Sequence, residues 1–166
     1  MEGHRTILLL GGNMGQRRRL LAEARGEIVL RAGRVLKASS LYETEPWGFE
    51  SEQNFLNQVV VVATNHGPQE LLTILQEIEK QLGRKKEKTP TREENDGPGG
   101  YSSRPIDIDI LFYDQQIIDT PTLKVPHPQL HKRRFTLEPL HEVAPDMLHP
   151  VLKKTTARLL DECRDN

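Results

Sequence analysis

Two aspartates alternate with isoleucines in residues 104–111, which read Arg-Pro-Ile-Asp-Ile-Asp-Ile-Leu. In a β-strand every second side chain points to the same face, so Asp107 and Asp109 would project together and the isoleucines to the other face. Carboxylates placed in this way can converge on a pair of Mg²⁺ ions that also bind substrate phosphates. The alternative is a half-exposed strand with two solvated aspartates. Because aspartate is depleted in strands and like charges on one face repel, we favour the metal site.

Basic residues surround this segment on both sides. Arginines beside metal-binding carboxylates suit phosphoryl transfer, which depends on positioning and on neutralising oxygen charge. Taken alone, the first basic group is interrupted by acids and also fits a solvated loop, while an RNA-binding patch is a weaker alternative because no aromatic residues are interleaved. A zinc pair of His127 and His131 is disfavoured by the prolines on either side of His127. The cations are Arg84, Lys85, Lys86, Lys88, Arg92 and Arg104 before the aspartates, and Lys124, His127, His131, Lys132, Arg133 and Arg134 after them.

A third group that could bind a ligand is Asn57 with Phe55, at the start of an apolar run. A carboxamide presents a donor and an acceptor side by side, which suits the edge of a heterocycle. The alternative is that Asn57 caps a turn and Phe55 belongs to the core. Residues 11–15, Gly-Gly-Asn-Met-Gly, follow another apolar run but fit neither the dinucleotide fingerprint nor the P-loop pattern, so we interpret them as a turn.

The elements that must position these residues follow from the hydrophobic pattern. The order strand-helix-strand-strand-helix-strand predicts an α+β ferredoxin-like sandwich, an antiparallel sheet with helices packed on it and additions at the C-terminal end. Strands are expected over 6–10, 35–42, 55–64 and 106–113, with a short partner of the last over 116–119; helices over 15–32 (ended by Gly33), 68–82 (ended by Gly83), about 137–144 and 155–163; and a long loop over 84–104.

Composition limits the classes of function. The 166 residues fit one domain, 1–166, and the net charge of −1 gives no global field toward nucleic acid or a membrane. The single cysteine, Cys163, excludes an internal disulfide and suits a reducing compartment. The apolar run at the N-terminus is too short for a signal peptide or a membrane span. We expect a cytoplasmic monomer that acts on small molecules, with no nucleic-acid or membrane partner.

Eight motifs, in their order and separation, resemble the 6-hydroxymethyl-7,8-dihydropterin pyrophosphokinases. The likeness covers nearly the whole chain to about Pro150, and the aspartate motif followed by Val-Pro-His is its most specific part. The motifs are Leu-Gly-Gly-Asn (10–13), Tyr-Glu-Thr-Glu-Pro-Trp-Gly (42–48), Phe-Leu-Asn (55–57), Gln-Glu-Ile-Glu (76–79), Gly-Arg (83–84), the segment 104–111, Val-Pro-His (125–127) and Arg-Arg-Phe (133–135).

This resemblance implies a ferredoxin-like fold and, in folate synthesis, transfer of diphosphate from ATP to the pterin hydroxymethyl group with release of AMP. It implies two Mg²⁺ ions on Asp107 and Asp109, and a loop carrying Arg84 and Arg104 that closes during turnover. Those four residues would be catalytic. The pterin site would comprise Thr44, Trp47, Phe55, Asn57 and Phe135, and the ATP site Gln76, Glu79, Arg84, Lys86, Arg104, Ile110, Leu123, Lys124, His127 and Arg133.

Two other functions remain open from the residues alone. A nucleotidyltransferase or cyclase could use the same pair of carboxylates on a similar sandwich. A non-enzymatic RNA-binding or regulatory module is the second alternative, and the near-neutral charge disfavours it.

Overall fold

A central antiparallel sheet organises the protein. The computed structural model describes residues 3–12, 16–44, 54–86 and 106–165. The strand order is β2-β4-β1-β5, with β3 paired to the other end of β4. This order, with one helix after β1 and another after β4, is that of the predicted ferredoxin-like sandwich, which is confirmed. The strands are β1 (His4–Gly12), β2 (Gly33–Ala38), β3 (Tyr42–Thr44), β4 (Phe55–Thr64) and β5 (Asp107–Tyr113).

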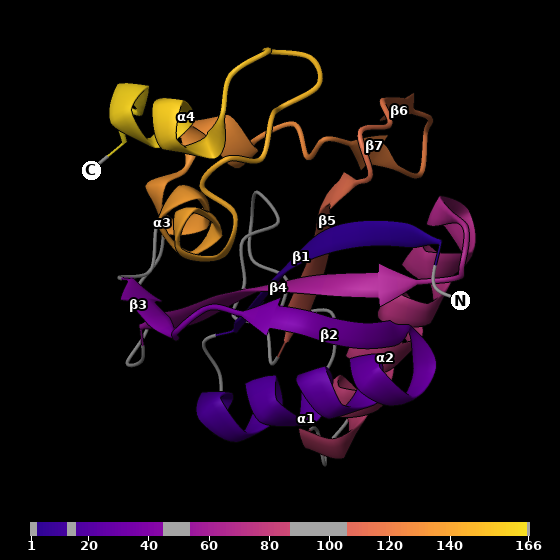
Figure 1. The fold of residues 1–166 in the computed structure, drawn as a ribbon. Coiled ribbons are helices and arrows are strands. Elements are labelled where there is room, and N and C mark those ends of the chain that lie inside the picture. The colour runs from indigo at the N-terminus through magenta and orange to yellow at the C-terminus, as the bar shows by residue number, and fades with distance from the viewer. Residues whose placement is uncertain (1–2, 13–15, 45–53, 87–105, 166) are drawn as a thin grey trace.

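Helices cover both faces of this sheet (Figure 1). On one face lie α1 (Arg17–Arg31) and α2 (Pro68–Lys86), and on the other lie α3 (Arg134–Val143) and α4 (Thr156–Glu162). Each face has its own apolar core, because β1 and β4 are buried on both sides. The C-terminal additions also include β6 (Ile118–Asp119), β7 (Lys124–Val125) and the 3₁₀ helix η3 (Leu130–Lys132). No helix among the described residues is long and apolar enough to cross a bilayer.

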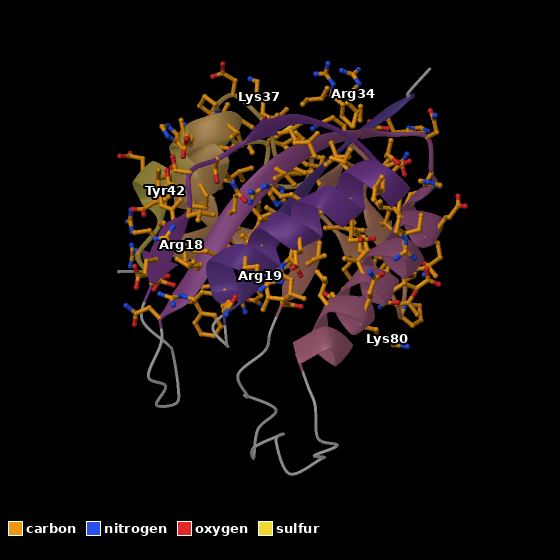
Figure 2. All side chains as sticks on the ribbon, turned by 90° about the horizontal axis from the view of Figure 1, so that it is seen from below. Arg18, Arg19, Arg34, Lys37, Tyr42 and Lys80 are labelled. Carbon is orange, nitrogen blue, oxygen red and sulfur yellow. The ribbon has the colours of Figure 1, made fainter. Side chains whose placement is uncertain are left out.

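The α1–α2 layer shows why these segments are helical. In α1 the buried residues Leu20, Leu21, Ala24 and Ile28 recur at helical spacing and form one stripe against the sheet. The outer side of the layer carries charged side chains, and Figure 2 shows Arg18 and Arg19 of α1 and Lys80 of α2 among those on the surface, although Val29 and Leu30 of α1 are exposed as well. Apolar burial on one side and solvation on the other hold this layer in place.

Three expected boundaries are wrong. Residues 11–12 continue strand β1 rather than forming a turn, since they pair with β4. Helix α2 runs through Gly83 to Lys86, because a glycine inside a helix costs only about 1 kcal/mol and does not by itself end it. The expected strand 35–42 is two strands separated by residues 39–41, and within this break the Ser39 hydroxyl accepts the Val59 N–H.

The C-terminal additions also differ from the sequence expectation. Residues 118–119 pair with β7 and not with β5, so the expected hairpin after β5 does not form. Helix α3 begins at Arg134, three residues before the expected start, and α4 agrees with its expected range to within one residue at each end. The expected loop 84–104 lies partly in α2 and otherwise outside the described residues.

Strand β5 contains a bulge opposite β1. Ile7 pairs with Phe112 and Leu8 with Ile110, so β5 has one residue more than β1 at this point, Leu111. The Leu111 carbonyl accepts a hydrogen bond from the His127 N–H at 3.0 Å. The bulge therefore attaches the segment after β7 to the sheet.

Candidate active site

A polar row crosses strands β3, β4, β1 and β5 at one end of the sheet. Gly11 of β1 is flanked by Asn57 of β4 and by Asp107 of β5, and Tyr42 of β3 continues the row beyond Asn57. Cross-strand partners point to the same face, here the face that α3 covers further along. The amide and the carboxylate, 50 residues apart in sequence, therefore lie on the same face of the sheet with only a glycine between their strands.

The two aspartates emerge together, as predicted. Asp107 and Asp109 are half-buried, whereas Ile108 and Ile110 between and beyond them are buried in the core toward α1 and α2. The alternation follows from the two-residue period of the strand. The carboxylates consequently share one face of β5, on the side away from α1 and α2.

Glu79 of α2 adds a third carboxyl group to this end of β5. Its Oε2 accepts the Ile108 N–H at 2.6 Å, and the side chain also hydrogen-bonds to Asp107. Burial, with the negative charges of Asp107 and Asp109, raises the pKa of Glu79 to about 8, against the opposing effect of the Ile108 N–H. At neutral pH this carboxyl group is mainly protonated and able to donate to Asp107. The negative charge at this end of β5 therefore comes from Asp107 and Asp109, where the sequence predicts Mg²⁺ ions.

His127 lies close enough to Asp107 and Arg133 for both charges to affect it. Burial lowers the pKa of His127, Arg133 lowers it further, and Asp107 opposes the shift. The ring is therefore neutral at neutral pH. Its Nδ1 accepts the Gln129 N–H at 3.1 Å, so the proton is assigned to Nε2, which can donate to an anion. Arg133 in turn lies over the Phe135 ring, 5.5 Å from its centroid.

The residues predicted to bind the edge of a heterocycle lie on β3 and β4. Asn57 is buried, with 5% of its surface exposed, and its Nδ2 donates to the Thr44 hydroxyl at 3.3 Å. It is a strand residue, so the alternative of a turn-capping asparagine is wrong. Phe55 is two residues away on the same strand and therefore on the same face, half-buried. Phe135, at the start of α3, packs against the core on this face.

The other predicted site residues fall into three groups. Ile110 and Leu123 are buried in the core, so their side chains pack against the protein. Gln76 on α2 and Lys124 on β7 are exposed, and Lys124 forms an ion pair with Asp119. Trp47, Arg104 and the side chains of Arg84 and Lys86 lie outside what the structure describes.

The donor set fits magnesium. Within the described residues, no three His, Cys, Asp or Glu side chains are grouped so that they could hold a metal ion by themselves. Mg²⁺ binds through one or two carboxylates together with substrate phosphates and water, which is what the pair on β5 offers. Zinc, which takes three or four protein ligands, does not fit these residues.

Comparison with known proteins shows the family to which the chain belongs. Residues 7–145 match the family model of 7,8-dihydro-6-hydroxymethylpterin-pyrophosphokinase. The chain belongs to this family. It is 46% identical over 146 residues to the 2-amino-4-hydroxy-6-hydroxymethyldihydropteridine pyrophosphokinase of Porphyromonas gingivalis, covering 87% of this chain and 93% of that one. The enzyme of the same name from Aquifex aeolicus is 40% identical over 150 residues, 90% and 86% of the two chains.

A crystal structure of Plasmodium falciparum HPPK-DHPS shares the fold with this chain, with a TM-score of 0.73 at 18% identity. It matches 96% of this chain, which spans 42% of that longer one. Membership of the pyrophosphokinase family makes the protein an ATP-dependent pyrophosphokinase of folate biosynthesis, with ATP as co-substrate. The resemblance stated from the motifs is thereby confirmed.

Sequence reasoning missed what Gly11 does. It placed this glycine in a turn, whereas the structure places it inside a strand, between the strands that carry Asn57 and Asp107. The available signal was a glycine directly continuing an apolar strand pattern, which often marks a close approach of another group. Glu79 was expected at the nucleotide, and its contacts with β5 could not be read from its place on a helix.

Proposed function

We propose that this chain transfers the diphosphate of ATP to the hydroxymethyl group of 6-hydroxymethyl-7,8-dihydropterin and releases AMP. The observation that carries the proposal is the polar row, in which the buried amide of Asn57 and the carboxylate of Asp107 flank Gly11 on one face of the sheet. A ring read by the amide would have its hydroxymethyl group directed toward the carboxylates. The two substrates would thus meet over Gly11.

Asp107 and Asp109 would hold two Mg²⁺ ions together with the phosphates of ATP. Bound there, magnesium would neutralise charge on the phosphate oxygens and make the acceptor hydroxyl more acidic. Glu79 keeps the β5 backbone in place through the Ile108 N–H, and the neutral His127 can donate Nε2–H to a phosphate oxygen. Arg84, Lys86, Arg104 and Arg133 would bind further phosphate oxygens, with Arg84 and Arg104 on a segment that closes over the substrates.

The pterin would be read at its edge by Asn57, with the backbone of Thr44 and Trp47. The rings of Phe55 and Phe135 would stack on its two faces, an arrangement that aromatic surfaces favour. Asn57 is well suited to this task because it is buried and its amide nitrogen already has a partner in Thr44, which fixes the orientation of the carboxamide. The exposed side chains of Gln76 and Lys124, with the backbone of Ile110 and Leu123, would line the adenosine end of the ATP site.

In the reaction the pterin hydroxyl oxygen attacks the β-phosphorus of ATP. A new bond forms between that oxygen and the β-phosphorus, and the bond from the β-phosphorus to the α–β bridging oxygen breaks. AMP leaves with the bridging oxygen, and the hydroxyl proton passes to solvent. The protein's part is to align the two substrates and to balance the charge of the phosphates, which is the main source of rate in phosphoryl transfer.

Product analysis tests this proposal. The protein is incubated with ATP, Mg²⁺ and the reduced pterin, and the adenine nucleotide and the pterin product are identified by mass spectrometry. AMP with a diphosphorylated pterin is the expected result. Free pyrophosphate with a nucleotidylated product would support the nucleotidyltransferase alternative, and absence of ATP consumption would contradict the proposal.

We further propose that residues 1–166 form one domain that works as a monomer in the cytoplasm. Two packed cores on a single sheet support one cooperative unit. Light scattering should give the mass of one chain, and a mass of two or more chains would contradict the monomer. Thermal unfolding should proceed in one transition, and two separated transitions would contradict the single domain.

A further inference from the structure

Gly11 occupies a position in the sheet where a side chain would be expected. It lies in the interior of the sheet on β1, paired with β4 on one side and β5 on the other. Its backbone is not in the left-handed region that favours glycine. Glycine weakens a strand, because it adds backbone entropy to the unfolded chain and has no side chain to pack. The residue therefore needs a reason other than backbone geometry.

That reason is the carboxamide of Asn57. A Cβ atom on Gly11 would lie 2.8 Å from Asn57 Oδ1, closer than two such atoms approach in proteins. The next nearest atoms are the Leu56 carbonyl oxygen at 3.5 Å and Asn57 Cγ at 3.9 Å, both at ordinary contact distances. The conflict is thus confined to the oxygen at the end of one side chain. The amide lies over Gly11 because no side chain occupies that space.

We propose that Gly11 is a positioning residue for pterin recognition, because its missing side chain lets the Asn57 carboxamide lie against β1 in the orientation that reads the ring. This inference rests on the proposed function, in which Asn57 contacts the pterin. Any larger residue at position 11 would push Oδ1 away from β1 and turn the amide away from its Thr44 partner.

Gly33 provides the contrast. A Cβ atom there would lie 2.1 Å from the carbonyl oxygen of Ala63, which is backbone and cannot move without opening the β2–β4 pairing. Alanine at position 33 should therefore damage the fold. Alanine at position 11 meets only a side chain that can rotate, so the fold should persist and the amide should move. The two glycines are required for different reasons.

The test compares Gly11→Ala with Asn57→Ala and with Gly26→Ala as the matched control. Gly26 lies in α1 with nothing within 4 Å of its added Cβ, so alanine there should leave binding unchanged. Calorimetric titration measures binding of 6-hydroxymethyl-7,8-dihydropterin, and separately of a non-hydrolysable ATP analogue with Mg²⁺. We expect Gly11→Ala to weaken pterin binding about tenfold or more, as for a buried polar group that loses its partner, with nucleotide affinity unchanged.

The double variant completes the design. Because both substitutions act through one amide, Gly11→Ala in the Asn57→Ala background should cause no further loss of pterin affinity. If Gly11→Ala lowers the melting temperature, the added Asn57→Ala should restore part of it, since the clashing oxygen is then absent. Normal pterin affinity in Gly11→Ala with a loss in Asn57→Ala would overturn this inference alone. Normal affinity in both would overturn the proposed pterin site itself, as would equal losses of pterin and nucleotide binding in Asn57→Ala.

Discussion

Two rows on the same three strands serve opposite purposes. Near one end of the face toward α3, Ile7 of β1 lies between Val61 and Phe112, all three buried in the apolar core beneath that helix. Four residues further along β1, Gly11 lies between Asn57 and Asp107. The first row stabilises the sheet by burying apolar surface, and the second places polar groups on a rigid support. Stability and chemistry are therefore separated along the strands rather than between domains.

The largest effect is expected from the carboxylates. Asp107→Asn and Asp109→Asn keep the size of each side chain but remove the charge that would hold Mg²⁺. Turnover should fall at least about 100-fold, comparable to the loss of a group that stabilises transition-state charge. The melting temperature should stay the same or rise, because two like charges no longer face each other. Steady-state assays with calorimetric Mg²⁺ titration measure both, and near-normal turnover in either variant would refute the metal assignment.

In the apolar row we expect a large loss of stability and no loss of turnover. Ile7→Ala removes buried methyl groups and leaves a cavity, so the free energy of unfolding should fall by about 2–5 kcal/mol. Turnover per folded molecule should be unchanged, because the polar row lies four residues further along β1. Urea unfolding and assays below the transition measure the two quantities, with Ile7→Val as a milder control. A large loss of turnover in folded protein would show that the two rows are not independent.

Asn57→Ala should affect recognition more than stability. It should weaken pterin binding by about 1–3 kcal/mol, or roughly 10- to 100-fold. The matched control is Gln58→Ala on the opposite face of β4, where the side chain bonds Arg25 and the Ser39 carbonyl. That variant should lose stability and keep its pterin affinity. Equal effects of the two substitutions on pterin binding would mean that the faces of β4 are not functionally distinct.

The smallest effect is expected at Glu142, whose hydrogen bonds connect α3 to Ser40 and Tyr42. Glu142 of α3 accepts hydrogen bonds from Tyr42 and from the backbone and hydroxyl of Ser40, which holds β3 under the helix. The Tyr42 and Ser40 hydrogen bonds lower the pKa of Glu142 below its usual 4.5. Its stabilisation is therefore complete above about pH 4.5 and lost as the pH falls through the lowered value.

Glu142→Gln should consequently cost no more than about 1 kcal/mol at pH 7, since the group lies at the surface. The difference from the unsubstituted protein should disappear in acid. Urea unfolding at a series of pH values measures this, and a difference that persists at low pH would contradict the charge-based explanation. Arg158→Gln, at a surface ion pair with Glu162 on α4, serves as a control remote from β3.

The sequence predicts local periodicity well and long-range contacts poorly. The alternation at Asp107 and Asp109 and the order of the main elements could be predicted, because each depends on neighbouring residues. The expected partner of residues 118–119 was wrong because pairing with β7 is decided by tertiary packing. The contact of Glu79 with the Ile108 N–H joins a helix to a strand 29 positions away, and no local pattern indicates it. The turn expected at residues 11–12 failed because glycine is usually found in turns, while here it makes room for an amide.

The extra residue in β5 decides which face of the sheet the side chains on either side of it point to. Before Leu111 the odd-numbered side chains, Asp107 and Asp109, point away from α1 and α2, whereas after it Tyr113 points toward them. Deleting one codon between positions 109 and 112 would remove this offset and force one half of the strand to invert. Either Asp107 and Asp109 would point into the apolar core, or Tyr113 would point out of it. Insertions and deletions in this short segment should therefore be more damaging than substitutions.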